Sequence, residues 1–502
     1  MCSRISRVSL FGTTMNDPRT PSIDLQAIAR QVMQEQGFEP NFPPETQQQL
    51  NEINAHPPQL TTSDKVRDLR NLLWSSIDND TSKDLDQIEV AERLPNGDVK
   101  VMIGIADVDA FVAKGTVIDQ HAERETTSVY TGVSIFPMLP NELSTGASSL
   151  LPDVDRPAVV TEFVVNAKGT LDSSSVYRAV VRNKAQLTYN AVGAWLEGTA
   201  AAPPKVAASA ELQAQLKLQD EVAQKLKKLR YENGALNIDT AEVVPLLLNQ
   251  QVMDVVRVTK NRATDLIEDF MVAANGVVAR FLEKVSSLRR IVRTPAHWDG
   301  IVRLAAAQGE KLPATPDSKA LNDFLVKRKA ADPDHFADLS LAVIKLVGPG
   351  EYILERPGDT PEGHFGLAVQ DYTHSTAPNR RFPDVVTQRL IKAVLDGKPN
   401  PYSDTDLAAI ASNCTQKGDA ARKVEREMSK RLSAMAMSHR IGETFDAMVT
   451  GVTPKGTFVR VVQPHMEGFL AQGGQGLHVG DKLRAKLTRT DVQRGFIDFV
   501  KA

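Results

Sequence analysis

The chain has 502 residues, of which 42% are hydrophobic and 24% charged, so it is a folded globular protein rather than a disordered or fibrous one. Its 59 Lys and Arg nearly balance its 62 Asp and Glu, which excludes binding of nucleic acid by bulk positive charge but allows a local basic groove. The two cysteines, Cys2 and Cys414, exclude a disulfide framework, and no apolar run approaches the roughly 20 residues of a membrane span. We therefore expect a cytoplasmic protein that does not associate with membranes.

The N-terminal region is rich in Gln, Asn and Pro and is expected to be helical. Apolar residues recur at helical spacing over 24–36, a stretch that stops at Gly37. Two further helices are predicted over 43–53 and 61–73, and we find no set of alternating strands here. These patterns predict a small helical N-terminal domain over residues 1–70.

The pattern then changes, first to strands and afterwards to helices. Strands are predicted over 98–105, 157–165 and 175–181, and Asn96 with Gly97 has the composition of a hairpin turn. From about residue 185 to 440 the apolar residues return to helical spacing. Helices are predicted over 211–231, 264–284, 296–308, 319–329, 384–395 and 405–439.

The C-terminal stretch, residues 441–502, contains five short apolar strands separated by turns with Gly, the pattern of a small OB-type barrel. Residues 411–502 carry 15 Lys and Arg against nine Asp and Glu, so this end of the chain is basic. Two aromatic residues, Phe458 and Phe469, lie in the predicted strands. A basic barrel with aromatic rings is suited to binding a nucleic-acid strand.

Four aspartates, Asp78, Asp80, Asp84 and Asp86, occur within nine residues. Like charges this close repel one another, and the repulsion is relieved by solvent or by a cation. If the segment is extended, Asp84 and Asp86 point to one face, and carboxylate oxygens are ligands that suit magnesium or manganese. An exposed acidic loop is the alternative interpretation.

Two arginines, Arg380 and Arg381, lie between Pro378 and Pro383 just before a predicted helix. Arginines held on a stiff turn at the start of a helix can clamp a phosphate group with paired hydrogen bonds. In the alternative interpretation, they form ion pairs with Asp384 and other acidic residues.

Taken together, these stretches resemble the catalytic domain of the ribonuclease II / ribonuclease R (RNB) family. The resemblance covers about residues 70–435, in the order of the family, and the barrel that follows is similar to the family's S1-type RNA-binding domain. It is carried by 78–87, Ile103-Gly-Ile-Ala-Asp-Val, 127–140 with Leu143-Ser144, Gly234-Ala-Leu, 266–275 and 372–384. The resemblance implies an α+β fold with an RNB-type catalytic domain (a mixed sheet with surrounding helices) over 71–440, a small helical N-terminal domain and an S1-type OB-fold barrel over 441–502.

The activity implied by the resemblance is hydrolytic removal of nucleotides from the 3′ end of single-stranded RNA, releasing nucleoside 5′-monophosphates. Asp78, Asp84 and Asp86 match the family's metal-binding and catalytic aspartates, and Gln87 stands at a further ligand position. The cofactor implied is Mg²⁺, with Mn²⁺ as a substitute. Arg380 matches the arginine that offsets charge on the phosphate in the transition state.

The resemblance also implies contacts with RNA, and it suggests a monomer whose partner is the 3′ end of single-stranded RNA. Tyr130 matches the aromatic residue that stacks on the terminal base. Tyr189 and Glu268 match residues that distinguish RNA from DNA, and Glu425 matches a late glutamate near the site. Further RNA contacts are expected from Arg381 on the phosphate side and from Phe458 on the barrel.

Three departures from the family pattern stand out. Gln87 replaces the usual fourth aspartate, so one formal charge is lost and metal binding should weaken. Ile238 occupies the position where relatives often have an aromatic residue as the second jaw of the base clamp. The N-terminal region is too short for the two cold-shock barrels of many relatives, so residues 1–70 should guide RNA differently, as a helix-turn-helix-like module.

Two rival functions follow from these features. Loss of charge at Gln87 would suit a catalytically weakened RNA-binding protein on the same scaffold. The aspartates alone would also suit a metal-dependent phosphoesterase that acts on small phosphate esters.

Overall fold

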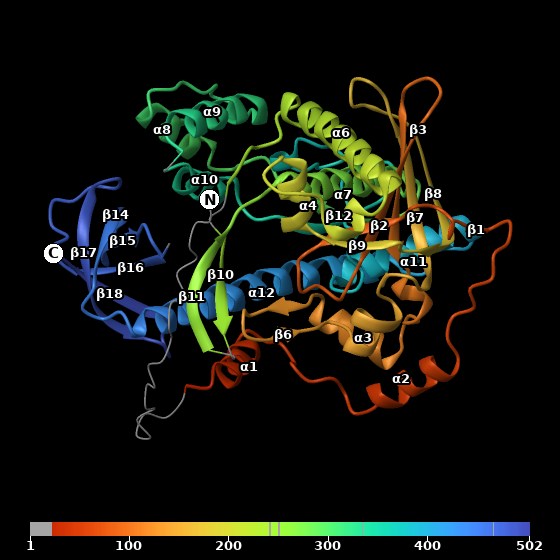
Figure 1. Cartoon of the computed structure of the whole chain (residues 1–502), viewed down its shortest axis with the longest axis horizontal. Helices are drawn as coiled ribbons and strands as arrows, with labels where there is room; N and C mark the ends of the chain where they lie inside the picture. The colour runs from red at the N-terminus through yellow and green to blue at the C-terminus, as the bar shows by residue number, and fades with distance from the viewer. Residues whose placement is uncertain (1–22, 240–241, 249–250, 334, 465) are drawn as a thin grey trace, which may run out of the picture.

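The computed structural model describes residues 23–239, 242–248, 251–333, 335–464 and 466–502, and for 242–248 and 251–258 it describes only the backbone. Cys2 lies outside these residues. The molecule has a broad body built on one large sheet, a long helix that crosses the body, and a barrel at one end (Figure 1). In the described part of the chain, no helix is long and apolar enough to cross a lipid bilayer.

Seven strands form the central sheet of the body, in the order β1, β8, β7, β4, β3, β2, β9. Their bounds are β1 (Val66–Asp68), β2 (Ser75–Asp78), β3 (Gln87–Arg93), β4 (Val99–Ala106), β7 (Asp155–Val165), β8 (Leu171–Arg182) and β9 (Ala185–Thr188). The two outer strands pair in parallel with β8 and β2, whereas the other neighbours are antiparallel, so the sheet is mixed as expected. Gly97, with φ +91°, lies in the predicted turn between β3 and β4.

The two faces of the sheet bury different side chains, because successive strand residues point to opposite sides. On β4, Val101 and Ile103 face the larger hydrophobic core, whereas Met102 faces a second cluster around Trp74. Helices α6 (Ala210–Glu232) and α7 (Arg262–Phe281) cover the first face (Figure 1). Both helices were expected from the spacing of their apolar residues, and they hold the segments around the candidate site in place.

Further helices and three two-stranded sheets complete the body. The helices are α3 (Val117–Glu125), α4 (Tyr189–Leu196), α5 (Pro204–Ala207), α8 (Trp298–Ala307), α9 (Ser318–Ala331), α10 (Phe336–Val347), α11 (Phe382–Asp396) and α12 (Asp404–Ser438), with short helical turns at Val108–Ala110, Leu143–Ala147 and Phe365–Leu367. The strand pairs are β5 (Val129–Tyr130) with β6 (Ile135–Phe136), β10 (Glu242–Leu248) with β11 (Gln251–Val258), and β12 (Ser287–Ile291) with β13 (Glu351–Glu355). The six predicted helices are confirmed, but none of the three strand pairs was predicted, because short apolar runs do not distinguish strand from helix.

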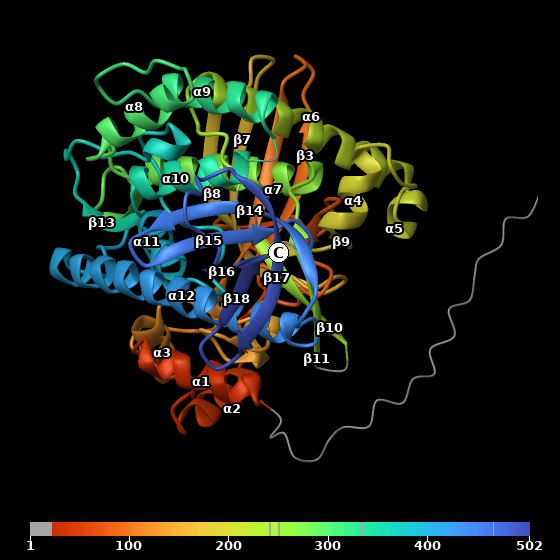
Figure 2. The same cartoon turned by 90° about the vertical axis from the view of Figure 1, so that its left-hand side faces the viewer.

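Helix α12 links the body to the C-terminal barrel. Its start is capped by Ser403, which accepts a hydrogen bond from the N–H of Asp406 while the Asp406 side chain accepts one from the N–H of Ser403. The strands β14 (Thr444–Thr453), β15 (Gly456–Val461), β16 (Met466–Gln472), β17 (Lys482–Asp491) and β18 (Phe496–Lys501) close into a barrel in the order 14, 15, 16, 18, 17. This confirms the predicted five-stranded barrel, which lies in front of the body in Figure 2.

Two of the three predicted N-terminal helices are present, α1 (Leu25–Glu35) and α2 (Thr46–Ala55). The helix predicted over 61–73 is wrong, because this segment contains β1 at the edge of the sheet. There the N–H of Leu69 donates to the carbonyl of Val180 (2.9 Å), so the open sheet edge supplies hydrogen bonds that override the helical spacing.

The two N-terminal helices pack on different parts of the body. Helix α1 lies against α12, and Leu25 enters the core that α12 shares with the barrel. Helix α2 lies against α3 instead. That residues 1–70 form a domain that guides RNA stays a prediction.

Candidate active site

The predicted aspartates lie in the loop that joins β2 to β3. Asp78 is the last residue of β2, and Asp86 immediately precedes β3. Between Asp84 and Asp86, the side chain of Leu85 is buried in the cluster on the second face of the sheet. The N–H of Leu85 donates to Ser149 Oγ (3.0 Å), which anchors the loop.

Asp86 is the most deeply buried of the four aspartates, with 3% of its surface exposed. One carboxylate oxygen accepts a hydrogen bond from the N–H of Asn379 (2.9 Å), and the other lies 3.5 Å from Nε of Arg380. Burial raises the pKa of Asp86 to about 7; Arg380 and the Asn379 bond oppose this rise, and Asp84 adds to it. A carboxylate in this environment is stabilised in its charged form by a nearby cation.

Asp78 belongs to the same electrostatic environment, and Asp80 does not. The Asp78 side chain accepts hydrogen bonds from the N–H of Asn79 (2.7 Å) and from Ser82 Oγ (2.9 Å). Burial raises the pKa of Asp78, and the charge of Asp84 raises it further. Asp80 is exposed and accepts a hydrogen bond from a surface asparagine of α4 (3.0 Å). Three of the four aspartates therefore share one site.

The neighbouring arginines Arg380 and Arg381 have different partners. Arg380 faces Asp86, and its side chain is 44% exposed. Arg381 instead donates to the buried Asp384 (2.7 Å), the pairing that the sequence had left open as an alternative. The carbonyl of Arg380 accepts a hydrogen bond from the N–H of Ser128 (3.0 Å), which ties this segment to the chain that leads into β5. Arg380 is thus the arginine of the aspartate site.

Tyr130 connects the aspartates to α12. Its hydroxyl donates to Asp84 Oδ2 (3.4 Å), and its N–H donates to Glu425 Oε1 (3.4 Å). Burial raises the pKa of Tyr130, so the hydroxyl remains a neutral donor at physiological pH. The residue is nevertheless 39% exposed and is accessible to a partner. Of the predicted RNA contacts, Tyr130 therefore lies beside the aspartates, and Glu425 lies beside Tyr130.

Tyr189 and Glu268 lie near the start of α7. Asn261, which caps α7, donates to the carbonyl of Tyr189 (3.1 Å), and burial together with the charge of Asp78 raises the pKa of the Tyr189 hydroxyl. Glu268 forms ion pairs with Lys260 (2.6 Å) and Arg230 (3.1 Å). Burial alone would raise the pKa of Glu268, but these two cations hold it below its usual value, so Glu268 is a carboxylate.

Gln87 and its strand neighbour Glu89 point to the same face of β3. Gln87 is buried, and its amide donates to the carbonyl of Ile77 (3.5 Å). Glu89 is fully buried, and its carboxylate oxygens have no hydrogen-bond partner among the described residues. Burial and, to a lesser extent, Asp78 raise the pKa of Glu89 well above its usual value. Sequence analysis missed Glu89, although an acidic residue between Ile88 and Val90 in an apolar strand was an available signal.

The donors of the site suit a hard divalent cation, because Asp78, Asp84 and Asp86 offer only carboxylate oxygens. Among the residues that the structure describes, no group of three His, Cys, Asp or Glu side chains lies close enough to hold one ion. The three aspartates therefore fit such an ion in donor type and charge, and their side chains would have to draw together to ligate it.

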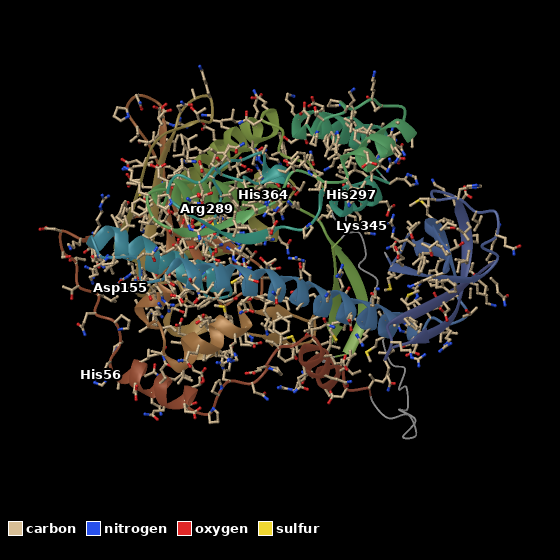
Figure 3. The ribbon with its side chains drawn as sticks, turned by 180° about the vertical axis from the view of Figure 1, so that it is seen from behind. His56, Asp155, Arg289, His297, Lys345 and His364 are labelled. Atoms are coloured by element: carbon tan, nitrogen blue, oxygen red, sulfur yellow. The ribbon has the colours of Figure 1, made fainter. Side chains whose placement is uncertain are left out.

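Histidines are distributed over separate elements of the fold. Figure 3 shows His56 after α2, His297 before α8 and His364 before the turn Phe365–Leu367. His374 lies in the segment before Arg380, but burial lowers its pKa well below the ordinary value, and its Nδ1 lies 2.6 Å from Tyr352 Oη. These four histidines are therefore not placed as a metal cluster.

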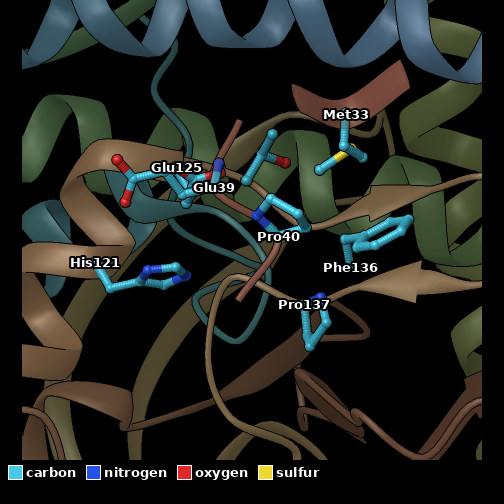
Figure 4. A pocket seen from close by; sticks show the side chains of 8 residues that line it. Met33, Glu39, Pro40, His121, Glu125, Phe136 and Pro137 are labelled. Atoms are coloured by element: carbon cyan, nitrogen blue, oxygen red, sulfur yellow. The ribbon is translucent and has the colours of Figure 1, made fainter. Parts of the chain in front are cut away.

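A small pocket lies between the N-terminal segment and the body (Figure 4). Its lining includes Met33, Glu39, His121 and Glu125, and its volume is only about 10 Å³. This is room for about one water molecule, so the pocket is a packing gap rather than a ligand site.

Two further predicted positions, Phe458 and Ile238, pack in other clusters of the fold. On the barrel, Phe458 lies opposite Phe469, with ring centroids 5.7 Å apart and both rings partly exposed. On the same strand, Arg460 forms a bidentate ion pair with Asp338 of α10, which fastens β15 to the body. Ile238 packs at the edge of the hydrophobic cluster formed by α8, α9 and α10.

Comparison with known families agrees with this architecture. The RNB domain is matched over residues 66–397, and the RNase II-type exonuclease C-terminal S1 domain over residues 443–502. The chain belongs to the RNB family. The matched ranges contain the aspartate loop, Arg380 and the whole barrel.

The relatives of this RNB protein include several ribonucleases R. The ribonuclease R of Thermotoga maritima is 29% identical over 97% of this chain and 71% of its own length. Those of Lactococcus lactis and Escherichia coli are each 28% identical over 91% of this chain, which spans only 59% and 60% of their lengths.

Solved structures show the same fold. Mycoplasma genitalium RNase R in complex with ribose methylated single-stranded RNA has a TM-score of 0.85 at 22% identity, covering 95% of this chain and 78% of that protein. Yeast Ssd1, a pseudonuclease, has a TM-score of 0.71 at 17% identity, covering 94% of this chain and 58% of that protein. Because the fold is shared by a nuclease and a pseudonuclease, activity has to be argued from the site residues.

Proposed function

We propose that this protein is a magnesium-dependent exoribonuclease that removes nucleotides from the 3′ end of single-stranded RNA and releases nucleoside 5′-monophosphates. The observation that carries the proposal is the arrangement around Asp86. This buried carboxylate is coupled to Asp84 and faces Arg380 at 3.5 Å, so negative donors for a cation and a positive donor for a phosphate meet at one place. The ribonuclease R relatives supply the reaction class.

Asp78, Asp84 and Asp86 would hold Mg²⁺, with Mn²⁺ as a substitute and Gln87 as a neutral neighbour. The ion would supply an activated water and would stabilise the departing oxygen. The chain contributes positioning: the Asn379 N–H fixes one oxygen of Asp86, and the backbone pairing of Arg380 with Ser128 fixes the arginine. Arg380, with its exposed guanidinium, can then donate to the phosphate as negative charge grows on it.

The RNA contacts follow from the same geometry. Tyr130 is partly exposed beside Asp84 and can stack on the terminal base. The charge of Asp78 acts on the hydroxyl of Tyr189, and Asn261 at the start of α7 donates a hydrogen bond to the carbonyl of Tyr189. The charged Glu268 lies further along α7. These two groups can sense the ribose 2′-hydroxyl, which a neutral donor and a carboxylate can both bind. Phe458 and the basic surface of the barrel would guide the incoming strand, whereas Arg381, already paired with Asp384, would contribute mainly by holding the Arg380 segment.

The decisive experiment follows the products formed from single-stranded RNA carrying a label at either end, with a DNA strand of the same sequence as control. With Mg²⁺, a 3′ label should appear at once as a mononucleotide, and a 5′ label should shorten stepwise. Chelation of divalent ions should stop both, and the DNA should persist.

Two results would contradict the proposal. If the RNA is bound but no mononucleotide accumulates, the protein is a weakened RNA-binding member of the family, as Gln87 and the likeness to Ssd1 would allow. If a small phosphodiester such as bis-p-nitrophenyl phosphate is hydrolysed while RNA is neither bound nor cut, the protein is a small-ester phosphoesterase.

A further inference from the structure

A cavity of about 210 Å³ lies beside the segment that carries Arg381, and none of the four aspartates lines it. One water molecule requires about 10–15 Å³ of such volume, so this cavity can hold a solute much larger than water. Its walls come from four parts of the chain: the segment leading into β5 (Thr126, Thr127, Ser128), the paired strands β12 and β13 (Arg290, Tyr352), the residues around Arg381, and α12 from Cys414 to Glu425.

Three arginines line the cavity: Arg290 from β12, Arg381, and Arg422 from α12. No carboxylate among the described residues forms an ion pair with Arg290, whose guanidinium lies over the ring of Tyr352, 4.8 Å from its centroid. Arg381 is paired with Asp384, but its Nε is buried without a hydrogen-bond acceptor. Arg422, at the rim, is paired with Asp419 on the same helix.

Neutral donors complete the lining. The hydroxyl of Tyr352 and the ring of His374 contact each other at 2.6 Å along one wall, and Thr127 and Ser128 form another. The acidic side chain in the lining is Glu425, which accepts the N–H of Tyr130. Asp384 and Asp419 each neutralise one of the three arginines, so the positive charge that an anion would meet first is that of Arg290.

The cavity is connected to the aspartate site through the backbone. Thr127 pairs with Arg381 as in an antiparallel bridge, and the N–H of Phe382 donates to the carbonyl of Thr126 (2.8 Å). Arg380 is the last residue of a turn over 378–380 and lies 3.5 Å from Asp86, whereas Arg381 follows the turn and lines the cavity. An anion in the cavity would be distinct from a phosphate held at Asp86.

We propose that this cavity is a binding site for a phosphate dianion, held by Arg290, Arg381 and Arg422, separate from the aspartate site. Guanidinium groups are the usual partners of phosphate oxygens, and Arg290 has no carboxylate partner among the described residues. The phosphate has two sources, inorganic phosphate and a nucleoside 5′-monophosphate. The inference goes beyond the proposed function and does not depend on it, because binding is measured without turnover.

The test is isothermal titration calorimetry on the full chain, in chloride buffer with a chelator so that no divalent ion is present. Inorganic phosphate, adenosine 5′-monophosphate and adenosine are titrated separately. Phosphate and the monophosphate should bind at one site and adenosine should not. Tighter binding of the monophosphate than of phosphate identifies the nucleotide as the ligand, and equal binding identifies the free anion.

Three variants locate the site. Arg290→Gln and Arg422→Gln should each weaken binding by about tenfold or more, the loss expected for a charge-assisted hydrogen bond. Gly418→Leu should do the same by filling the cavity, since a Cβ at Gly418 meets only the end of Arg422, at 4.0 Å. The matched control is Arg303→Gln, an exposed arginine of α8 with an equivalent helical ion pair, which should bind as the wild type does.

Arg380→Gln separates the two sites, because Arg380 is the cationic group beside Asp86. Phosphate binding should survive this substitution, and its loss there would assign the bound anion to the aspartate site and overturn the proposal. Wild-type affinity in Gly418→Leu and Arg422→Gln, or no binding to the wild-type chain, would overturn it equally. Thermal unfolding of each variant confirms that it is folded before its affinity is compared.

Discussion

Replacing Asp86 by Asn should separate catalysis from folding. The carboxylate of Asp86 is the most buried negative group of the site and faces Arg380. Its loss should lower turnover about a hundredfold or more, the scale of removing one preorganised electrostatic group. RNA binding should be unchanged or tighter, because one negative charge beside the phosphate disappears.

The same substitution should stabilise the metal-free protein. The pKa of Asp86 is about 7 in the folded chain against an ordinary value of 3.8, a difference that corresponds to about 4 kcal/mol. Since Asp86 releases its proton at a higher pH in the folded state than in the unfolded state, stability falls as the pH rises from about 4 to about 7. Asp86→Asn lacks this loss, so without metal it should be more stable than the wild type at pH 8, by up to about 4 kcal/mol, and equally stable near pH 4.

The measurements are single-turnover degradation of labelled RNA and urea unfolding at several pH values in the presence of a chelator. Asp80→Asn is the matched control, because Asp80 is exposed and lies outside the coupled aspartates. The control should change neither turnover nor the pH dependence of unfolding. Substantial turnover by Asp86→Asn would refute the catalytic role, and identical pH profiles of variant and wild type would refute the burial of its charge.

Three other substitutions test neighbouring parts of the site. Tyr130→Ala should weaken RNA binding by about 1–3 kcal/mol through loss of stacking, whereas Tyr130→Phe, which removes only the hydroxyl donated to Asp84, should bind RNA nearly normally in a filter-binding assay. Gln87→Asp should lower the Mg²⁺ concentration for half-maximal activity, and an unchanged requirement would place Gln87 outside the coordination sphere. Exchanging the exposed Lys482 and Lys486 of the barrel for Gln should reduce the salt dependence of RNA affinity. The slope of the logarithm of affinity against the logarithm of salt concentration should fall by about 0.7 for each lost phosphate contact. An unchanged slope would show that the barrel face that carries these lysines does not contact RNA.

Much of this architecture was predictable because its signals are local. Helices such as α6 and α12 carry long periodic apolar faces, and the barrel strands alternate between Gly-containing turns. The aspartate loop was predictable for the same reason, since Asp84 and Asp86 flank a single apolar residue that the core buries. The assignment of catalytic roles to these aspartates and to Arg380 stays a prediction that the experiments above address.

The features that could not be predicted from the sequence depend on partners that are distant along the chain. The segment 61–73 has helical spacing, but the open edge of β8 takes Val66–Asp68 as a strand. Likewise, the two arginines of the motif are equivalent in sequence, and only the positions of Asp86 and the buried Asp384 give them different partners. The cavity of the second site is built from β12, the Arg381 segment and α12, and no local pattern could have joined them.

Glu89 gives a last prediction, because it is a buried acid that the fold leaves without hydrogen bonds among the described residues. Its pKa is raised well above the usual 4.5 by burial, so the folded state holds its proton while the unfolded state releases it. Stability is therefore lost as the pH rises above about 4.5, at about 1.4 kcal/mol per pH unit until the folded group ionises. Glu89→Gln should remove this loss and be more stable than the wild type at pH 8 in urea unfolding.

Magnesium distinguishes the roles of the two buried acids. If Asp86 is a ligand, Mg²⁺ should stabilise the wild type at pH 8, because the ion compensates the charge whose burial is costly. Most of the difference in the free energy of unfolding between the wild type and Asp86→Asn should then disappear. Glu89 lies on the same face of β3 as Gln87 and feels the charge of Asp78, yet burial is the larger cause of its raised pKa. The difference in the free energy of unfolding between the wild type and Glu89→Gln should therefore persist in Mg²⁺. If Mg²⁺ removes this difference, Glu89 reaches the ion and supplies the negative charge that Gln87 lacks.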